Sequence, residues 1–249
     1  MTEIKKNQKE VVVLQHGFLC GSGYWQSVKR GLDAKFEVIV PVLPGFSENA
    51  SAQALNSING FAKFLLEFLD ARGIERFHLL GHSMGGMIAQ EVTMIAPERV
   101  HKLVLFGTGP IGNIPGRFET FEESRTRLKR EGAELLIENT VATWFVKGRD
   151  DPHYQTVIQE AKQASMEAIL GGYTAMEGWR GLERLRNIDA STLIVWGNQD
   201  RSYNESQVKL LRDGIHNGRL AVMPGCSHNA HLEDPSLFLK LVSDFLAED

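Results

Sequence analysis

The segment that most constrains the fold is Gly81-His82-Ser83-Met84-Gly85. It follows a short apolar run, residues 77–80, which is typical of a buried strand. It precedes residues 87–96, in which apolar side chains recur at helical spacing until Pro97 ends the pattern. The chain therefore passes from a strand to a helix through a very tight turn. Glycine stands at both ends of the pentapeptide because such a turn leaves little room for side chains.

A serine at the centre of this turn is expected to hold a strained backbone conformation, with its hydroxyl exposed at the end of a sheet and beside a helix N-terminus. Strand, sharp turn and helix form the context that a Gly-x-Ser-x-Gly nucleophile elbow requires. We therefore predict that Ser83 is a nucleophile. The alternative is a glycine-rich turn in which Ser83 only caps the helix, and the flanking strand and helix argue against it.

The order of apolar segments predicts the fold class. Further buried strands are expected at 11–16, 36–40, 100–106, 192–197 and 219–223. Helices are expected at 24–32, 58–69 and 235–246. Strands that alternate with helices are joined by right-handed crossovers, so we predict an α/β fold: an open, mostly parallel twisted sheet with helices on both faces.

The alternation stops in the middle of the chain. From about residue 107 to 186 no strand pattern is evident, and helical patterns occur near 119–130, 133–145 and 154–166, with a weaker one reaching Trp179. We interpret residues 110–186 as a helical cap inserted into a core domain made of residues 1–109 and 187–249. An insertion of this kind is expected over the carboxyl ends of the strands, where an open sheet binds its ligand.

Length and composition narrow the functional classes. A chain of 249 residues accommodates one α/β domain with an insertion, and its net charge of −4 without a basic block argues against a nucleic-acid partner. Cys20 and Cys226 are too few for a disulfide scaffold. The first ten residues are polar and the apolar run after them ends at Gln15, too short for a signal peptide or a membrane span, so we expect a cytoplasmic protein.

No cofactor is predicted from the sequence. The loop Gly21-Ser22-Gly23 does not complete a dinucleotide fingerprint, and no Walker-type lysine follows a glycine run. No cluster of histidine, cysteine, aspartate and glutamate has the sequence spacing of a metal site, so no metal is predicted either.

A serine nucleophile needs a base and a carboxylate that orients the base. Asp200 follows the predicted strand 192–197 by three residues, and His228 follows the strand 219–223 by five. Loops after later strands of an open sheet reach the same edge, so we predict a catalytic triad of Ser83, Asp200 and His228. Taken singly, Asp200 is also typical of a turn residue and His228 of an ordinary hydrogen-bonded histidine.

These motifs resemble the α/β-hydrolase fold superfamily almost from end to end. The resemblance rests on the His16-Gly17 loop, the elbow, the Trp-Gly-x-x-Asp segment that ends at Asp200, and a His-x-x-x-x-Glu-x-Pro run from His228 to Pro235. That last signature assigns His228, rather than His231, as the base. The resemblance also implies an oxyanion hole.

The implied oxyanion donors are the backbone N–H groups of Phe18 and Met84, with a favourable contribution from the helix that follows the elbow. One departure concerns the N-terminus. The family usually begins with a strand hairpin before the strand at 11–16, but residues 1–9 are too few for two strands. We therefore expect that edge of the sheet to be absent.

The cap is expected to shape the substrate pocket. Candidate pocket residues share large apolar or aromatic side chains near the predicted active-site edge, and packing inside the cap is the alternative role for most of them. They are His82, Trp144, Phe145, Met166, Met176 and Trp179.

The resemblance implies a small lidded serine hydrolase that cleaves a carboxylic ester or lactone of a small molecule through an acyl-enzyme. One alternative is a C–C bond hydrolase of aromatic ring-fission products, although such enzymes typically show a His-Gly-x-Gly-Pro-Gly loop, from which residues 16–21 depart. Another is a lyase of the menaquinone-pathway type, to which residues 227–231 are similar; that enzyme often has tyrosine at the position of His82. A non-enzymatic ligand receptor that keeps the triad is the alternative from a different class.

Overall fold

Six strands form one sheet in the computed structural model, which describes residues 9–114 and 119–248. The strands are β1 (Val11–Gln15), β2 (Glu37–Ile39), β3 (Phe77–His82), β4 (Val100–Phe106), β5 (Ser191–Gly197) and β6 (Gly218–Met223). Their order is β2-β1-β3-β4-β5-β6, and every neighbouring pair is parallel. The prediction of an open α/β sheet is confirmed.

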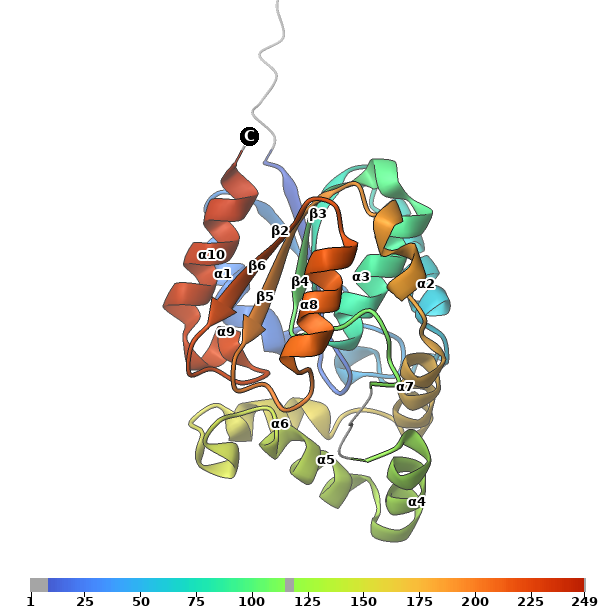
Figure 1. Cartoon of the computed structure of the whole chain (residues 1–249). Helices are drawn as coiled ribbons and strands as arrows, with labels where there is room; N and C mark the ends of the chain where they lie inside the picture. Colours follow the sequence, from blue (N-terminus) through green and yellow to red (C-terminus); the bar gives the residue numbers. More distant parts are fainter. Residues whose placement is uncertain (1–8, 115–118, 249) are drawn as a thin grey trace, which may run out of the picture.

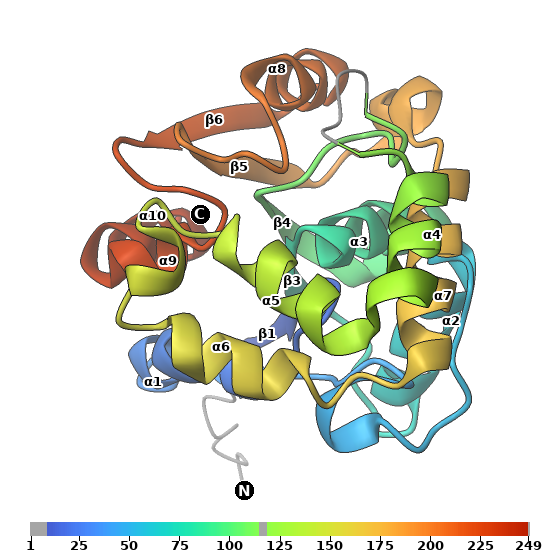
Figure 2. The ribbon, with the colours of Figure 1, turned by 90° about the horizontal axis from the view of Figure 1, so that it is seen from below.

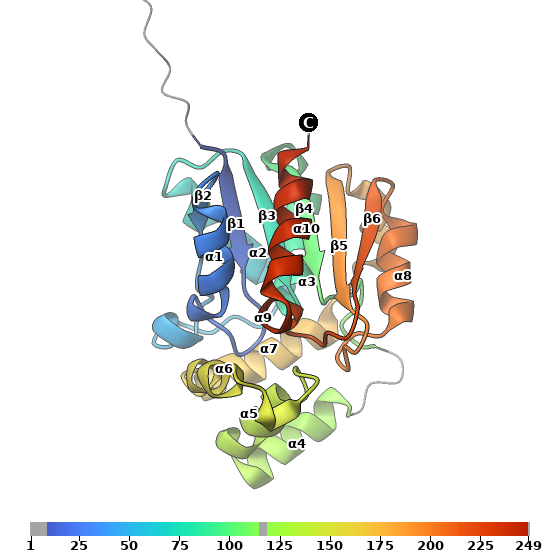
Figure 3. The same ribbon diagram turned by 90° about the vertical axis from the view of Figure 1, so that its left-hand side faces the viewer.

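Helices cover both faces of this sheet (Figures 1 and 3). On one face lie α1 (Gln26–Leu32) and α10 (Pro235–Ala247); on the other lie α2 (Ile58–Asp70), α3 (Met84–Ile95) and α8 (Glu205–Gly214). Because both faces are covered, the central strand β3 is buried along its whole length, as expected for an apolar run in a parallel sheet.

Two helices were not expected from the sequence. In α8 the side chain of Asn204 caps the N-terminus by accepting from the N–H of Gln207, and only Val208 and Leu211 supply buried apolar side chains. The single-turn α9 (Ala230–Glu233) lies directly before α10.

A buried lysine joins the sheet to the C-terminal helix. Lys102 of β4 is 5% exposed, and its ammonium donates to the backbone oxygens of Phe245 at 3.0 Å and Leu246 at 3.2 Å, and to that of Glu248. The last carbonyls of a helix receive no hydrogen bond from an N–H group of the same helix, and they carry partial negative charge. A buried cation is therefore favourable there. Lys102 therefore fixes the end of α10 against the amino end of β4.

Four helices of the insertion lie across the carboxyl ends of the strands: α4 (Phe121–Glu131), α5 (Ala133–Ala142), α6 (Tyr154–Ala161) and α7 (Met166–Gly178). Figure 2, which views the molecule from below, shows α5 and α6 crossing in front of the sheet. The helix expected over 154–166 ends earlier, at Ala161. The weaker helical pattern that reaches Trp179 is α7, whose start Ser165 caps by accepting from the N–H of Ala168.

The two ends of the insertion meet in a short neck. The N–H of Gly112 donates to the oxygen of Trp179 at 3.3 Å, and that of Gly181 donates to the oxygen of Pro110 at 2.8 Å. The cap boundaries 110–186 stay a prediction.

Across residues 9–114 and 119–248, none of the helices combines the length and the apolar character needed to cross a bilayer. The sequence predicts that no strand hairpin precedes β1. Most of the residues concerned, 1–8, lie outside the described residues.

Candidate active site

Ser83 is the single residue between β3 and α3, and its backbone has φ 56° and ψ −121°. A positive φ is strained for a residue with a side chain, and such strain is typical of functional turns. The neighbouring glycines are required sterically. A Cβ atom on Gly81 would lie 2.2 Å from the oxygen of Gly85, and one on Gly85 would lie 2.4 Å from the oxygen of His16.

Asp200 and His228 form a buried pair. Nδ1 of His228 lies 2.9 Å from Oδ2 of Asp200, and the two side chains are at most 1% exposed. A carboxylate oxygen can only accept here, so Nδ1 carries a proton, and in the neutral ring Nε2 is the nitrogen with the free lone pair. The other carboxylate oxygen, Oδ1, accepts from the N–H groups of Ser202 at 2.7 Å and Tyr203 at 3.1 Å. These bonds hold the carboxylate in one orientation.

The loops that carry these two residues are bonded to each other. The N–H of Gln199 donates to the oxygen of Cys226 at 2.9 Å, and the hydroxyl of Ser227 donates to the oxygen of Gln199 at 3.2 Å. At Gly197 a Cβ atom would lie 2.3 Å from the oxygen of Ser227, so the backbones approach closely. The close approach and the bonds between them hold the two loops together.

A buried network that the sequence did not reveal supports the main chain at His228. Nε2 of His82 lies 3.1 Å from the backbone oxygen of His228 and therefore carries the proton of that ring. The hydroxyl of Tyr24 lies 3.3 Å from the same nitrogen and donates to Oδ1 of Asn229 at 2.6 Å. Burial, with a contribution from the nearby His228, lowers the pKa of His82 well below its ordinary value.

His82 was predicted as a pocket residue. The structure shows it 1% exposed, with its ring centroid 4.4 Å from that of His228.

The loop after β1 is fixed by His16. Nε2 of its ring accepts from the N–H of Leu43 at 3.0 Å, so Nδ1 carries the proton and donates to the oxygen of Gly17 at 2.8 Å. Complete burial lowers the pKa of His16 to about 4, so the ring is neutral. Leu19, further along the loop, has φ 61°, a second strained residue at this edge.

The predicted oxyanion donors, Phe18 and Met84, belong to two segments that come close to Ser83. Met84 is the first residue of α3, and the first N–H groups of a helix have no acceptor within it. Phe18 lies in the loop at Gly17, where a Cβ atom would be 3.0 Å from Cβ of Ser83. The Phe18 ring packs against Phe46 at 6.1 Å and Tyr173 at 5.1 Å, measured between ring centroids. The oxyanion hole stays a prediction.

The predicted pocket residues of the cap differ in position. The ring of Trp144 lies 5.9 Å from that of His228, whereas Met166 is 42% exposed at the start of α7. Phe145 and Met176 are buried, and Trp179 packs beneath the guanidinium of Arg184 at 5.2 Å. Tyr203, which the sequence did not indicate, stacks on His228 with ring centroids 5.8 Å apart.

Two carboxylates join the cap to the core. Glu233 accepts from the N–H of Ser227 at 2.5 Å and from that of Val146, in the cap, at 2.7 Å. Glu160 of α6 accepts from the N–H of Gly23 at 2.8 Å. Burial raises the pKa of both carboxyl groups.

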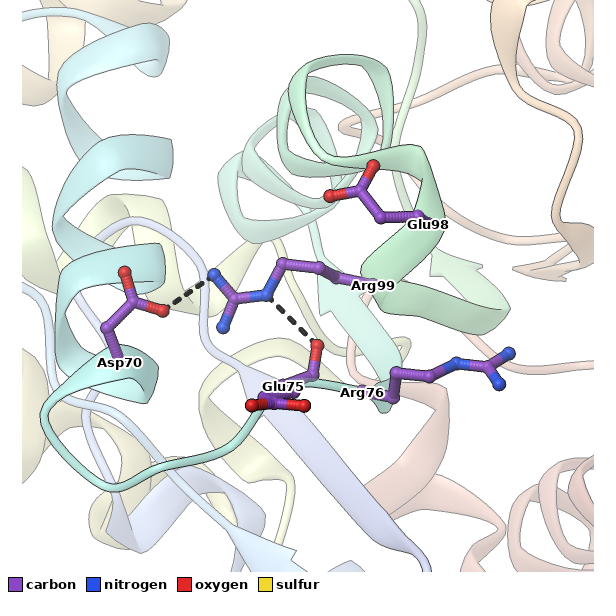
Figure 4. A pocket seen from close by; sticks show the side chains of 5 residues that line it. All are labelled: Asp70, Glu75, Arg76, Glu98 and Arg99. Atoms are coloured by element: carbon purple, nitrogen blue, oxygen red, sulfur yellow. Dashed lines mark hydrogen bonds and ion pairs between the residues drawn. The ribbon is translucent and has the colours of Figure 1, made fainter.

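A surface pocket lies at the opposite end of the strands from Ser83, beside the starts of β3 and β4 (Figure 4). Asp70, Glu75, Arg76, Glu98 and Arg99 line it. Arg99 crosses it, pairing with Asp70 at 2.7 Å and donating to the backbone oxygen of Glu75 at 3.1 Å. None of the predicted site residues belongs to it.

Comparison with known proteins places this arrangement in a family. Residues 10–235 match the family model described as alpha/beta hydrolase fold. The 2-hydroxy-6-oxo-6-phenylhexa-2,4-dienoate hydrolase of Burkholderia cepacia is 29% identical over 264 residues, covering 96% of this chain and 88% of that protein. The 2-hydroxy-6-oxononadienedioate/2-hydroxy-6-oxononatrienedioate hydrolase of Escherichia coli K12 is 32% identical over 255 residues, covering 96% and 87%.

Among solved structures, the enol-lactonase from Burkholderia xenovorans LB400 superimposes with a TM-score of 0.89 at 19% identity, covering 98% of this chain and 94% of that one. This likeness concerns the fold alone. From the family match and the sequence relatives together, the chain belongs to the alpha/beta hydrolase fold family.

Proposed function

We propose that this protein is a serine hydrolase that cleaves a carboxylic ester or lactone of a small molecule through an acyl-enzyme. Ser83 is the nucleophile, His228 the base and Asp200 the residue that orients the base. The observation that carries the proposal is the buried pair of Asp200 and His228, 2.9 Å apart, whose proton placement leaves Nε2 of the imidazole able to accept a proton. The strained elbow at Ser83 supports it.

In the proposed reaction Oγ of Ser83 attacks the substrate carbonyl carbon while Nε2 of His228 takes the hydroxyl proton. The negative charge that develops on the carbonyl oxygen is stabilised by the N–H groups of Phe18 and Met84. His228 then gives its proton to the leaving alkoxide, and an ester of Ser83 remains. Water, deprotonated by the same imidazole, attacks this ester; the imidazolium then returns the proton to Oγ of Ser83 as the bond to the acyl group breaks and the acid leaves.

A second candidate is hydrolysis of a carbon–carbon bond next to a ketone. The names of the Burkholderia cepacia and Escherichia coli relatives favour it, since both describe 2-hydroxy-6-oxo acids. The same serine and histidine would act at a ketone carbonyl, but the leaving carbon must be protonated before it departs. The loop at 16–21 departs from the pattern typical of that group, and for this reason the ester or lactone is our first proposal.

The test is a comparison of substrates on one enzyme preparation. Turnover is measured for p-nitrophenyl acetate, p-nitrophenyl butyrate, a small lactone and 2-hydroxy-6-oxo-6-phenylhexa-2,4-dienoate. Ser83→Ala should lower kcat by about 10⁴–10⁶ on whichever substrate is preferred. Ser236→Ala, an exposed serine on α10, is the matched control and should have no effect.

Most of the activity surviving in Ser83→Ala would refute the proposal. A marked preference for the dienoate would replace the first candidate with the second. Binding of these compounds without turnover would identify a receptor.

A further inference from the structure

Three potential metal ligands meet at the amino ends of the strands, whereas Ser83 lies at the carboxyl ends. Glu10 precedes β1, His78 is the second residue of β3 and His101 the second residue of β4. Because β1, β3 and β4 are adjacent and parallel, these three positions lie side by side. Nε2 of His78 is 3.5 Å from Oε2 of Glu10, and Nδ1 of His101 is 3.6 Å from Oε1 of Glu10.

Within the described part of the chain Nδ1 of His78 has no hydrogen-bond partner, and Nε2 has only the 3.5 Å contact with Glu10, although the residue is 1% exposed. A buried polar group without a partner is costly, so an imidazole in this state needs an explanation. Its Nε2 is directed at Glu10, and its ring stacks on that of His101 with centroids 4.9 Å apart.

We propose that Glu10, His78 and His101 bind a divalent transition-metal ion, with Zn²⁺ as the best match. Two imidazoles and one carboxylate are typical ligands of Zn²⁺. One ligand atom from each residue lies within 4.8 Å of the others. Tetrahedral coordination at zinc–nitrogen distances near 2.05 Å separates ligand atoms by roughly 3.3 Å, so the cluster needs only a modest contraction.

The exposure of the three residues fits that contraction. The side chains of His101 and Glu10 are 48% and 61% exposed, so both can adjust while the buried His78 stays in place. A fourth position is open to water on this exposed side. Lys102 is a nearby group with the same positive sign of charge as the ion, and its ammonium is engaged by the carbonyls at the end of α10.

The proposed role is structural, because the ion would join the start of β1 to β3 and β4 at the edge far from Ser83. Binding to the folded chain alone raises its stability by mass action. Ester turnover is therefore not expected to depend on the ion, and the proposal does not rest on the proposed function.

The experiment is calorimetric titration of the untagged, chelator-treated full chain with Zn²⁺, together with thermal unfolding. We expect one ion per chain and, at a hundredfold excess over Kd, a rise in Tm of roughly 5 °C. His101→Ala and Glu10→Gln each remove one ligand from an exposed position and should weaken binding at least about tenfold. At the same Zn²⁺ concentration the rise in Tm should then fall by about half or more. His216→Ala removes an exposed histidine elsewhere and should bind as the original chain does.

Co²⁺ in place of Zn²⁺ supplies an independent signal, because its visible spectrum reports nitrogen ligands and should change in His101→Ala. The proposal is overturned by the lack of saturable one-to-one binding up to about 1 mM Zn²⁺. It is also overturned if His101→Ala binds as tightly as His216→Ala.

Discussion

Val146 and Glu233 are joined across the boundary between cap and core, since the N–H of Val146 donates to Oε1 of Glu233 at 2.7 Å. The other oxygen of this carboxylate accepts from the N–H of Ser227, directly before His228. The N–H of Asn229 donates in turn to the oxygen of Trp144 at 3.0 Å. The segment after α5 and the loop of His228 are thus held as one unit, and the cap takes part in placing the imidazole.

Glu233→Gln tests this connection. A glutamine has one accepting oxygen where the carboxylate has two, so one of the two N–H groups faces an amide NH₂ instead. We expect a loss of about 1.5–3 kcal/mol in the free energy of unfolding and a lower kcat, both measured on the full chain. Glu183→Gln, an exposed carboxylate in the segment before β5, is the control. Unchanged kcat in Glu233→Gln would show that the unit does not position His228.

Asp200→Asn keeps the size of the side chain but removes its charge. The amide NH₂ can present a donor to Nδ1 of His228, which favours the tautomer whose Nε2 carries a proton and cannot act as a base. We expect kcat for the preferred ester to fall by about 10⁴ with little change in fold. Asp213→Asn, an exposed residue paired with Arg212, should leave kcat unchanged. Equal rates in the two variants would contradict the assignment of Asp200.

Tyr24→Phe removes the hydroxyl that donates to Oδ1 of Asn229. Asn229 is fully buried and its Nδ2 has no partner among the described residues, so its amide would lose its remaining side-chain bond. We expect a loss of about 1–3 kcal/mol in unfolding free energy, with a fall in kcat but not in KM. Tyr154→Phe breaks a similar bond, to the oxygen of Glu138 in the cap. It should reduce stability without changing kcat, and equal effects on kcat would argue against a positioning role for Tyr24.

Acid stability depends on buried neutral histidines. Burial lowers the pKa of His16 to about 4 and that of His231 to about 3, and lowers the pKa of His82 as well. In the unfolded chain these rings take up protons near pH 6.5, whereas the folded chain resists protonation until the lower values are reached. The unfolded state therefore binds more protons below about pH 6.5, and stability is present above this pH and lost as the pH falls.

Each such histidine lowers the unfolding free energy by up to about 1.4 kcal/mol per pH unit in that window. Urea unfolding from pH 7.5 to 4.5 measures this slope. In His231→Gln the slope should decrease by the share of one histidine, whereas in His216→Ala, an exposed position, it should stay unchanged. A slope that does not differ between the two variants would contradict the neutral state of His231.

The parts of the fold that the sequence predicted are those with a local signal. The strands are continuous apolar runs because the sheet is covered on both faces, and the tight turn at Ser83 demands glycine on either side. Helix α8 was missed because only Val208 and Leu211 supply buried apolar side chains, too weak a periodic pattern. The boundary between α6 and α7 was placed too late, because residues 162–165 lie outside both helices without any glycine or proline to mark the break.

The residues of the candidate site likewise fall into those with a local sequence signal and those without one. Asp200 and His228 are indicated by their places after predicted strands, and the structure brings them into contact. The support of the His228 loop by Tyr24 is not visible in the sequence, since 205 positions separate Tyr24 from Asn229 and a lone tyrosine carries no pattern. Contacts of this kind depend on which strands become neighbours, and no local propensity encodes them.

The lysine beneath α10 has a consequence for the order of events in folding. The ammonium of Lys102 leaves water favourably only when the carbonyls of Phe245, Leu246 and Glu248 are in place to receive it. Until then a cation on a central strand must stay hydrated, which opposes closure of that end of the sheet. Burial of Lys102 and docking of the last turn of α10 are thus expected to occur together during folding.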